Sequence, residues 1–292
     1  MYELVSITSN CFYIESPAKI GLLSYNDKAY LIDSGSDASA AKKVKRHLDE
    51  RSLHLEAIFN THSHADHIGG NRYLQKQTLC NIYAPGIECD FTLHPILEPS
   101  YLYGGNPFSE LRHKFLMAES SEAKVLTKED TPEGLSIIPL PGHSFDMVGF
   151  RTCDDVVFLA DALSSERTLE KYQISFLVDV KSYLETLEEI CKMSARCFVP
   201  SHAEMTENIE PLARVNIAKV HEICETIISL SREKITFEEL LKKLFDHYSL
   251  QLNYEQYVLV GSTLRSYITY LKDKGELKSY IEDNRLLITS GE

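Results

Sequence analysis

The feature that most constrains this chain is a run of four metal-ligand residue types within six positions, His62, His64, Asp66 and His67. The run directly follows Leu55-Glu56-Ala57-Ile58-Phe59-Asn60, which has the pattern of a buried strand. We therefore expect the cluster on a loop at the carboxyl end of a strand, where α/β folds place their chemistry. Imidazole and carboxylate are ligands that suit zinc, iron or manganese, so the cluster indicates a metal site.

The spacing within the cluster favours two ions over one. His62 and His64 are two residues apart on an extended loop and can point to the same side. Asp66 and His67 turn towards a second position as the chain bends at Gly69-Gly70. We expect two divalent ions a few ångströms apart, zinc first, with iron or manganese as alternatives.

Two ions need more ligands, and the ends of later apolar runs offer them. His143 follows the run that ends at Leu140, Asp161 closes Phe158-Leu159-Ala160-Asp161, and His202 follows Cys197-Phe198-Val199. Together with the cluster, these three residues give seven candidate ligands.

The seven residues, in this order, resemble the signature of the metallo-β-lactamase fold superfamily, H-x-H-x-D-H followed by isolated His, Asp and His. The resemblance covers about residues 1–206 and implies an α/β (α+β) fold, a four-layer αββα sandwich with the site at one edge of its two sheets. Asp33 matches a family position that braces the site loop. The resemblance also assigns the ligands to two ions and a bridge: His62, His64 and His143; Asp66, His67 and His202; and Asp161 between them.

The character of the chain changes near residue 206. We expect a catalytic domain over residues 1–206 and a mainly helical C-terminal domain over residues 207–292. A capping box at Thr236-Phe237-Glu238-Glu239 opens one helix, and Asp283-Asn284 marks the turn of a closing hairpin. Helices followed by a hairpin resemble a winged-helix module.

Leu93 to Lys124 reads as an insertion, partly helical and punctuated by Pro and Gly, with a helical turn or two expected between Leu111 and Met117. Such segments often form lids over active sites. The candidates for substrate contact are the aromatic and imidazole side chains of this insertion, Tyr101, Tyr103, His94 and His113.

Charge and cysteine content limit the setting. The formal net charge is −13, and residues 207–292 hold 11 Lys and Arg against 14 Asp and Glu, which disfavours a nucleic-acid substrate. Seven dispersed cysteines without C-x-x-C spacing argue against a disulfide scaffold and favour a reducing cytoplasm. We expect no membrane association, and the sequence leaves a homo-oligomer open.

Departures from other members of the superfamily narrow the function. Flavodiiron proteins have a carboxylate where His64 stands, and secreted lactamases carry an export signal and a Cys ligand that this sequence lacks. The resemblance then favours a glyoxalase II-like hydrolase, in which a metal-bridging hydroxide oriented by the catalytic residue Asp66 attacks a small thioester, ester or lactone. A phosphodiesterase or nuclease of the same fold is the first alternative, and a non-catalytic metal-binding or interaction protein is the second.

Overall fold

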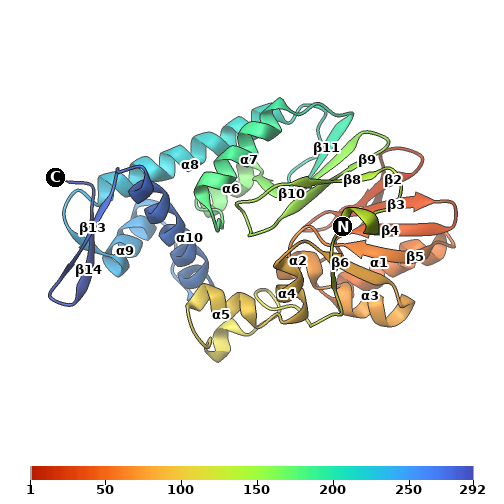
Figure 1. The fold of residues 1–292 in the computed structure, drawn as a ribbon, viewed down its shortest axis with the longest axis horizontal. Helices are drawn as coiled ribbons and strands as arrows, with labels where there is room; N and C mark the ends of the chain where they lie inside the picture. The colour runs from red at the N-terminus through yellow and green to blue at the C-terminus, as the bar shows by residue number, and fades with distance from the viewer. Residues whose placement is uncertain (1, 292) are drawn as a thin grey trace.

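Two β-sheets face each other in the computed structural model, which describes residues 2–291, and helices cover the outer face of each sheet (Figure 1). The first sheet has seven strands, antiparallel from β1 to β4 and parallel from β4 to β7. Its strands stand in chain order: β1 (Leu4–Ser6), β2 (Cys11–Ile14), β3 (Ile20–Tyr25), β4 (Lys28–Ile32), β5 (His54–Phe59), β6 (Asn81–Ala84) and β7 (Lys124–Val125). Helices α1 (Ala38–Glu50) and α3 (Asn71–Thr78) pack together on its outer side, with the short α2 (Ala65–Ile68) before α3.

The second sheet has four strands in the order β11-β10-β9-β8, and only the β10–β11 pair is parallel. They are β8 (Leu135–Pro139), β9 (Val148–Thr152), β10 (Val156–Ser164) and β11 (Cys197–His202). Two helices of this half, α6 (Glu166–Tyr172) and α7 (Val180–Lys192), lie between β10 and β11 in the chain. Helix layers outside two facing sheets confirm the predicted αββα sandwich.

Because side chains alternate along each strand, the first sheet has an apolar layer on each of its two faces. Ile58 packs with Val44 and Leu48 of α1, while its neighbour Phe59 points into the core between the sheets. There the Phe59 ring lies 5.9 Å from the ring of Phe150 on β9. Both phenylalanines are fully buried, so the two sheets are held face to face by packing.

The insertion contains helices α4 (Glu88–Leu93) and α5 (Leu97–Tyr103), followed by the 3-10 turn η1 (Ser109–Leu111). A second 3-10 turn, η2 (Lys128–Asp130), follows β7. The helical turn expected between Leu111 and Met117 is a single one, closed by the Met117 amide donating to the His113 carbonyl at 2.9 Å.

The C-terminal part contains helices and a small antiparallel sheet of order β12-β14-β13. Its elements are α8 (Glu210–Leu230), β12 (Ile235–Thr236), α9 (Phe237–His247), α10 (Tyr254–Asp273), β13 (Lys278–Glu282) and β14 (Arg285–Thr289). The Thr236 capping box is present, and Asp283 and Asn284 both have positive φ angles, 49° and 58°, as a tight hairpin requires. A helical C-terminal part is thus confirmed, and its likeness to a winged helix stays a prediction.

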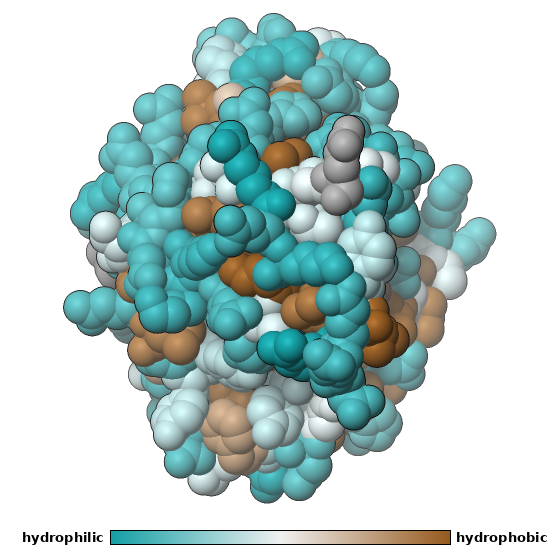
Figure 2. Space-filling model, turned by 90° about the vertical axis from the view of Figure 1, so that its left-hand side faces the viewer, coloured by the Kyte–Doolittle hydropathy of each residue, from teal (hydrophilic) through white to brown (hydrophobic). Residues whose placement is uncertain are grey.

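Figure 2 looks onto the face of this C-terminal part, which lies at the left of Figure 1. Hydrophobic patches there are small and separated by hydrophilic side chains. Inside, one apolar cluster joins Leu159 of β10 and Leu187 of α7 to Leu264 of α10 and Ile288 of β14.

The division into two domains at residues 206 and 207 stays a prediction, as does the cytoplasmic location. Among residues 2–291, no helix combines the length and apolar character needed to cross a bilayer.

Candidate metal centre

The ligand loop begins where β5 ends, and the carboxylate of Asp33, just after the neighbouring β4, fixes its start. Asp33 Oδ1 accepts from the Thr61 amide at 2.8 Å, and Oδ2 accepts from Thr61 Oγ1 at 2.8 Å. The Asp33 backbone has a φ of 64°, in the left-handed region that Asp and Asn tolerate better than most residues. The next residues extend through His62 and His64 before α2 turns Asp66 and His67 inward. The bend expected after the first two histidines is therefore a short helix.

The other three predicted residues arrive from the second sheet. His143 lies in the loop between β8 and β9, and His202 ends β11. The prediction that Asp161 closes its strand is wrong, because β10 continues to Ser164. The pairing of β10 with β11 is irregular on both sides of Ala160, which has a φ of 49°. This bulge interrupts the regular alternation of side chains beside Asp161.

All seven predicted residues meet in one cluster. On one side, His64 Nδ1 lies 3.0 Å from His62 Nε2 and 3.0 Å from His143 Nε2. On the other side, His202 Nε2 lies 3.4 Å from Asp66 Oδ2. Asp161 lies between the two sides: Oδ1 is 3.0 Å from His67 Nε2, and Oδ2 is 3.1 Å from His202 Nε2 and 3.6 Å from His143 Nε2.

Outward hydrogen bonds set the tautomer of four of the imidazoles. The Nδ1–H groups of His67, His143 and His202 donate to Asp33 Oδ2 at 2.7 Å, to the Phe176 carbonyl at 3.0 Å and to the Pro17 carbonyl at 2.8 Å. His62 Nδ1 donates to Thr61 Oγ1 at 3.0 Å, because the Thr61 hydroxyl proton is already directed to Asp33. In its neutral form, each of these rings therefore turns an unprotonated Nε2 towards the cluster, as a metal ligand must.

Two of the inner atoms also lack a hydrogen-bond partner. Among the described residues, five buried side-chain polar atoms have no hydrogen-bond partner, and two of them are His67 Nε2 and Asp161 Oδ1. In each of three groups of residues, the ligand atoms lie within 4.8 Å of one another. The groups are His62, His64 and His143; His62, His67 and Asp161; and Asp66, His67 and His202. Imidazole nitrogens and carboxylate oxygens that converge in this way fit divalent cations, so the residues present suit the metals that the sequence predicts.

The pKa shifts of the histidines differ between the two sides of the cluster. Burial holds the pKa of His62 well below its ordinary value and lowers the pKa of His64 and His143 to about 4. Burial also opposes the charged form of His67 and His202, but the attraction of Asp161 and other carboxylates outweighs it. The pKa of His67 is therefore raised, and that of His202 rises to about 10. The side that holds Asp66 and Asp161 thus favours positive charge.

Two glutamates that the sequence analysis did not single out lie beside the ligand loop, Glu88 fully buried and Glu98 half-buried. Glu88 Oε2 accepts from the Ser63 amide at 3.0 Å, between two ligand histidines, and Glu88 is 1% exposed. Glu98 Oε1 lies 3.6 Å from His64 Nε2, on the side of that ring that faces away from the cluster. Burial raises the pKa of Glu98 to about 8. No sequence signal separates these two from surface glutamates.

Two cavities border the cluster. The larger, of about 520 Å³, is lined by His143, Asp161 and His202, by α6 and the segment that follows it, and by Gln256, Leu259 and Val260 of α10. The smaller, of about 160 Å³, touches His64 and Asp66 and is closed by Glu98, Phe115 and Leu116 of the insertion. Phe176 and Leu259 line both cavities.

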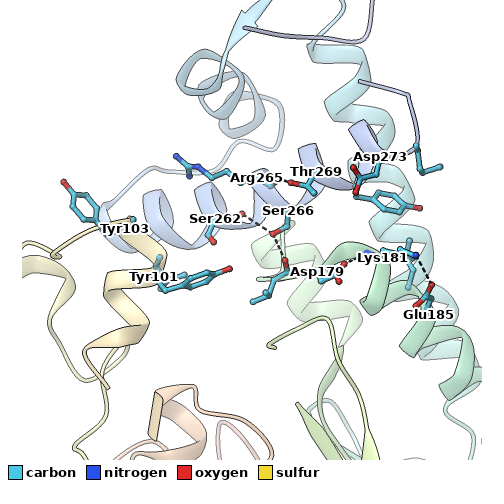
Figure 3. Close-up of a pocket in the computed structure, with 16 residues that line it drawn as sticks. Tyr101, Tyr103, Asp179, Lys181, Glu185, Ser262, Arg265, Ser266, Thr269 and Asp273 are labelled. Carbon is cyan, nitrogen blue, oxygen red and sulfur yellow. Dashed lines mark hydrogen bonds and ion pairs between the residues drawn. The ribbon is translucent and has the colours of Figure 1, made fainter. Parts of the chain in front are cut away.

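The four residues predicted to contact substrate line neither of these cavities. Tyr101 and Tyr103 border a separate hollow of about 1130 Å³ between α5, α7 and α10 (Figure 3), although Tyr101 also borders a very small void beside His64. His113 pairs with Glu255 at 3.0 Å, at the start of α10. His94 follows α4 and ends that helix. The substrate role of these four stays a prediction.

A comparison with known sequences identifies the family of the chain. A model of the metallo-beta-lactamase superfamily matches residues 8–202. The chain belongs to this superfamily. It is a metal-dependent hydrolase, as the sequence predicts. A relative in Pelagibacter ubique (strain HTCC1062), named hydroxyacylglutathione hydrolase, is 27% identical over 222 residues, which cover 72% of this chain and 82% of that protein.

Solved structures of the superfamily extend the likeness through the C-terminal part. A metallo-beta-lactamase family protein from Thermus thermophilus superposes with a TM-score of 0.75 at 17% identity, covering 97% of this chain and 99% of that one. A beta-lactamase domain protein from Burkholderia ambifaria has a TM-score of 0.70 at 15% identity, covering 98% and 93%. At these identities the likeness concerns the fold alone.

Proposed function

We propose that this chain is a binuclear metal-dependent hydrolase of small thioesters, esters or lactones, with zinc as the first candidate metal. The observation that carries the proposal is the convergence of seven ligand side chains from both sheets, four of them imidazoles with the outer nitrogen already hydrogen-bonded. His62, His64 and His143 would hold one ion, Asp66, His67 and His202 the other, and Asp161 would contact both.

Bound divalent ions supply a water of lowered pKa and a Lewis acid for a carbonyl oxygen. The residues of the chain would do the rest. Asp66 borders the smaller cavity, and its pKa is held below the ordinary value by His67 and His202 against the opposing effect of burial. Ionised Asp66 would orient the attacking water and accept its proton. Phe176 and Leu259, which line both cavities, would limit the access of bulk water.

The likeness to a protein named hydroxyacylglutathione hydrolase supports thioester chemistry as the first class to examine. Hydrolysis of a thioester needs no protein nucleophile when an activated water attacks the carbonyl carbon. The acid and thiol products then leave without a covalent enzyme intermediate.

The test combines metal analysis with a substrate panel. The purified protein should contain about two divalent ions per chain and should hydrolyse at least one of a thioester, an ester and a lactone. His64→Ala and Asp66→Ala should each lower kcat/KM by more than about 100-fold, in line with the loss of a metal ligand or general base. His54→Ala, the same change at an exposed histidine at the start of β5, should leave activity unchanged.

Three results would contradict the proposal. Activity that survives His64→Ala or Asp66→Ala would exclude this centre as the site of reaction. Turnover of a phosphodiester without turnover of any acyl substrate would favour the nuclease alternative. A protein that is fully loaded with metal and inert towards the whole panel would favour the non-catalytic alternative.

A further inference from the structure

The loop between β2 and β3 reaches across to the end of β11 in the other sheet and contacts three consecutive residues there. The Lys19 amide donates to the Ser201 carbonyl at 3.1 Å, and Lys19 Nζ donates to the Ala203 carbonyl at 2.7 Å. Between these two bonds, the Pro17 carbonyl accepts from His202 Nδ1 at 2.8 Å. A candidate metal ligand is thus held at its own ring and at both of its neighbours in the chain.

His202 has less support from packing than the other imidazoles of the cluster. Its side chain is 28% exposed. The side chains of His64 and His143 are 17% and 11% exposed, and those of His62 and His67 are fully buried. The direction of the His202 ring therefore depends more on hydrogen bonds than on surrounding side chains.

The chain also turns back directly after His202. Phe198 of β11 forms an antiparallel bridge with Thr206, so the residues after His202 form a bend. Ala203, the first residue of the bend, is 6% exposed, and its carbonyl accepts from Lys19 Nζ. A buried carbonyl that loses its donor costs free energy, so this bond determines where the bend begins.

The ammonium group of Lys19 has one close partner. The Lys19 side chain is 6% exposed, and a buried charge is stable only with partners. Besides the Ala203 carbonyl, Glu15 Oε1 lies 3.6 Å from Nζ and the centre of the Tyr13 ring 5.9 Å from it. The Glu15 side chain is 43% exposed, so solvent screens its attraction for Nζ. The hydrogen bond to Ala203 is therefore the main contact that fixes the ammonium group.

We infer that Lys19 is a positioning residue for the second metal ion. It holds the backbone on both sides of His202, so that His202 Nε2 faces Asp66 and Asp161. The inference rests on the proposed binuclear function and adds to it a residue that is not itself a ligand. A ligand that is already ordered binds its ion more tightly, because less freedom is lost when the ion arrives.

The experiment measures zinc binding to the purified protein in competition with a chelating indicator. Lys19→Met keeps an apolar stem of similar volume but cannot donate to the Ala203 carbonyl. We expect the affinity for one ion to fall by about 10- to 100-fold, the range usual for residues that orient a ligand, and the affinity for the other ion to stay within about twofold. The ligands of that other ion form no hydrogen bond with this loop among the described residues. His202→Ala identifies the affected ion, because it should weaken the same one.

Three variants separate the hydrogen bond from other effects of the substitution. Lys19→Arg keeps a donor and a positive charge, and it should bind both ions within about threefold of the wild type. Glu15→Gln removes the ion pair to Lys19 Nζ and leaves the bond to Ala203, so it should also stay within about threefold. Lys28→Met, the same change at an exposed lysine on β4, should leave both affinities unchanged.

Four results would overturn the inference. They are affinities within about twofold of the wild type for both ions in Lys19→Met, equal losses for both ions, a Lys19→Arg protein as weak as Lys19→Met, and a loss in Glu15→Gln as large as in Lys19→Met. If Lys19→Met does not fold, Lys19→Gln takes its place with the same expectations, because its amide ends one atom short of the position of Nζ. A wild-type protein that binds fewer than two ions would contradict the proposed binuclear centre, and this inference with it, before any variant is compared.

Discussion

The substitution Asp33→Asn tests how the hydrogen bonds of Asp33 support the ligand loop, without changing any of the seven candidate ligands. Asp33 accepts three hydrogen bonds, from the Thr61 amide, the Thr61 hydroxyl and His67 Nδ1, at 2.7 to 2.8 Å, and its side chain is nearly fully buried. Asparagine has the same shape and tolerates the positive φ of 64° found here. Its oxygen can still accept from the Thr61 amide, but its NH₂ group then faces His67 Nδ1.

The expected loss of metal affinity follows from the replacement of a hydrogen-bond acceptor by a donor beside His67. His67 loses a hydrogen bond to a charged group, worth about 1.5–3 kcal/mol. It can avoid the clash of donors only by moving its proton to Nε2, the atom that the metal needs. Metal affinity should therefore fall by roughly 10- to 100-fold, within the range usual for residues that orient a ligand.

The assay is competition for zinc against a chelating indicator, with kcat/KM on the best acyl substrate measured in parallel. Asp37→Asn is the matched control, because Asp37 caps α1 close by in the chain and Asn caps helices equally well. Wild-type metal affinity in Asp33→Asn, within about twofold, would refute the reasoning that Asp33 holds His67 in its ligand tautomer.

Three further predictions concern the same centre. Glu98→Leu removes the carboxyl group 3.6 Å from His64 Nε2 and should weaken zinc binding by about 10-fold, whereas Glu98→Gln, which keeps a polar group of the same shape there, should stay within about threefold in the same competition assay. Gly142→Ala would place a Cβ 2.3 Å from the Tyr183 nitrogen at a φ of 122°. It should lower the free energy of unfolding in urea by about 2–5 kcal/mol, and Gly104→Ala, with open space around its Cβ, by only about 1 kcal/mol. Zinc at 100 times its Kd should add about 2.7 kcal/mol for each site filled, a rise in Tm of roughly 5–10 °C by scanning calorimetry that chelation reverses. An unchanged Tm, or equal losses in the two glycine variants, would contradict these expectations.

The fold and the cluster were largely accessible from the sequence, because their signals are local. A buried strand followed by His62, His64, Asp66 and His67 places the loop, and alternation such as Ile58 against Phe59 predicts two covered faces of a sheet. The Thr236 capping box and the turn at Asp283 and Asn284 are likewise written in adjacent residues, and the structure has both.

Other parts of the site depend on contacts between residues far apart in the chain. Glu88 and Glu98 look like surface acids in the sequence and lose most of their exposure only when α4 and α5 pack beside the ligand loop. The bulge that extends β10 beyond Asp161 depends on how that strand pairs with β11.

The sequence by itself determined which side chains are candidates to hold metal, since a ligand is a property of residue type and four of the seven lie together on one loop. Only the tertiary structure decided what surrounds them. Phe176 and Leu259 meet at the cluster from segments more than 80 residues apart. The charge of each cavity is likewise the sum of the charges of all the residues that packing brings into its wall. That sum is a property of the folded chain, because no single segment contains it.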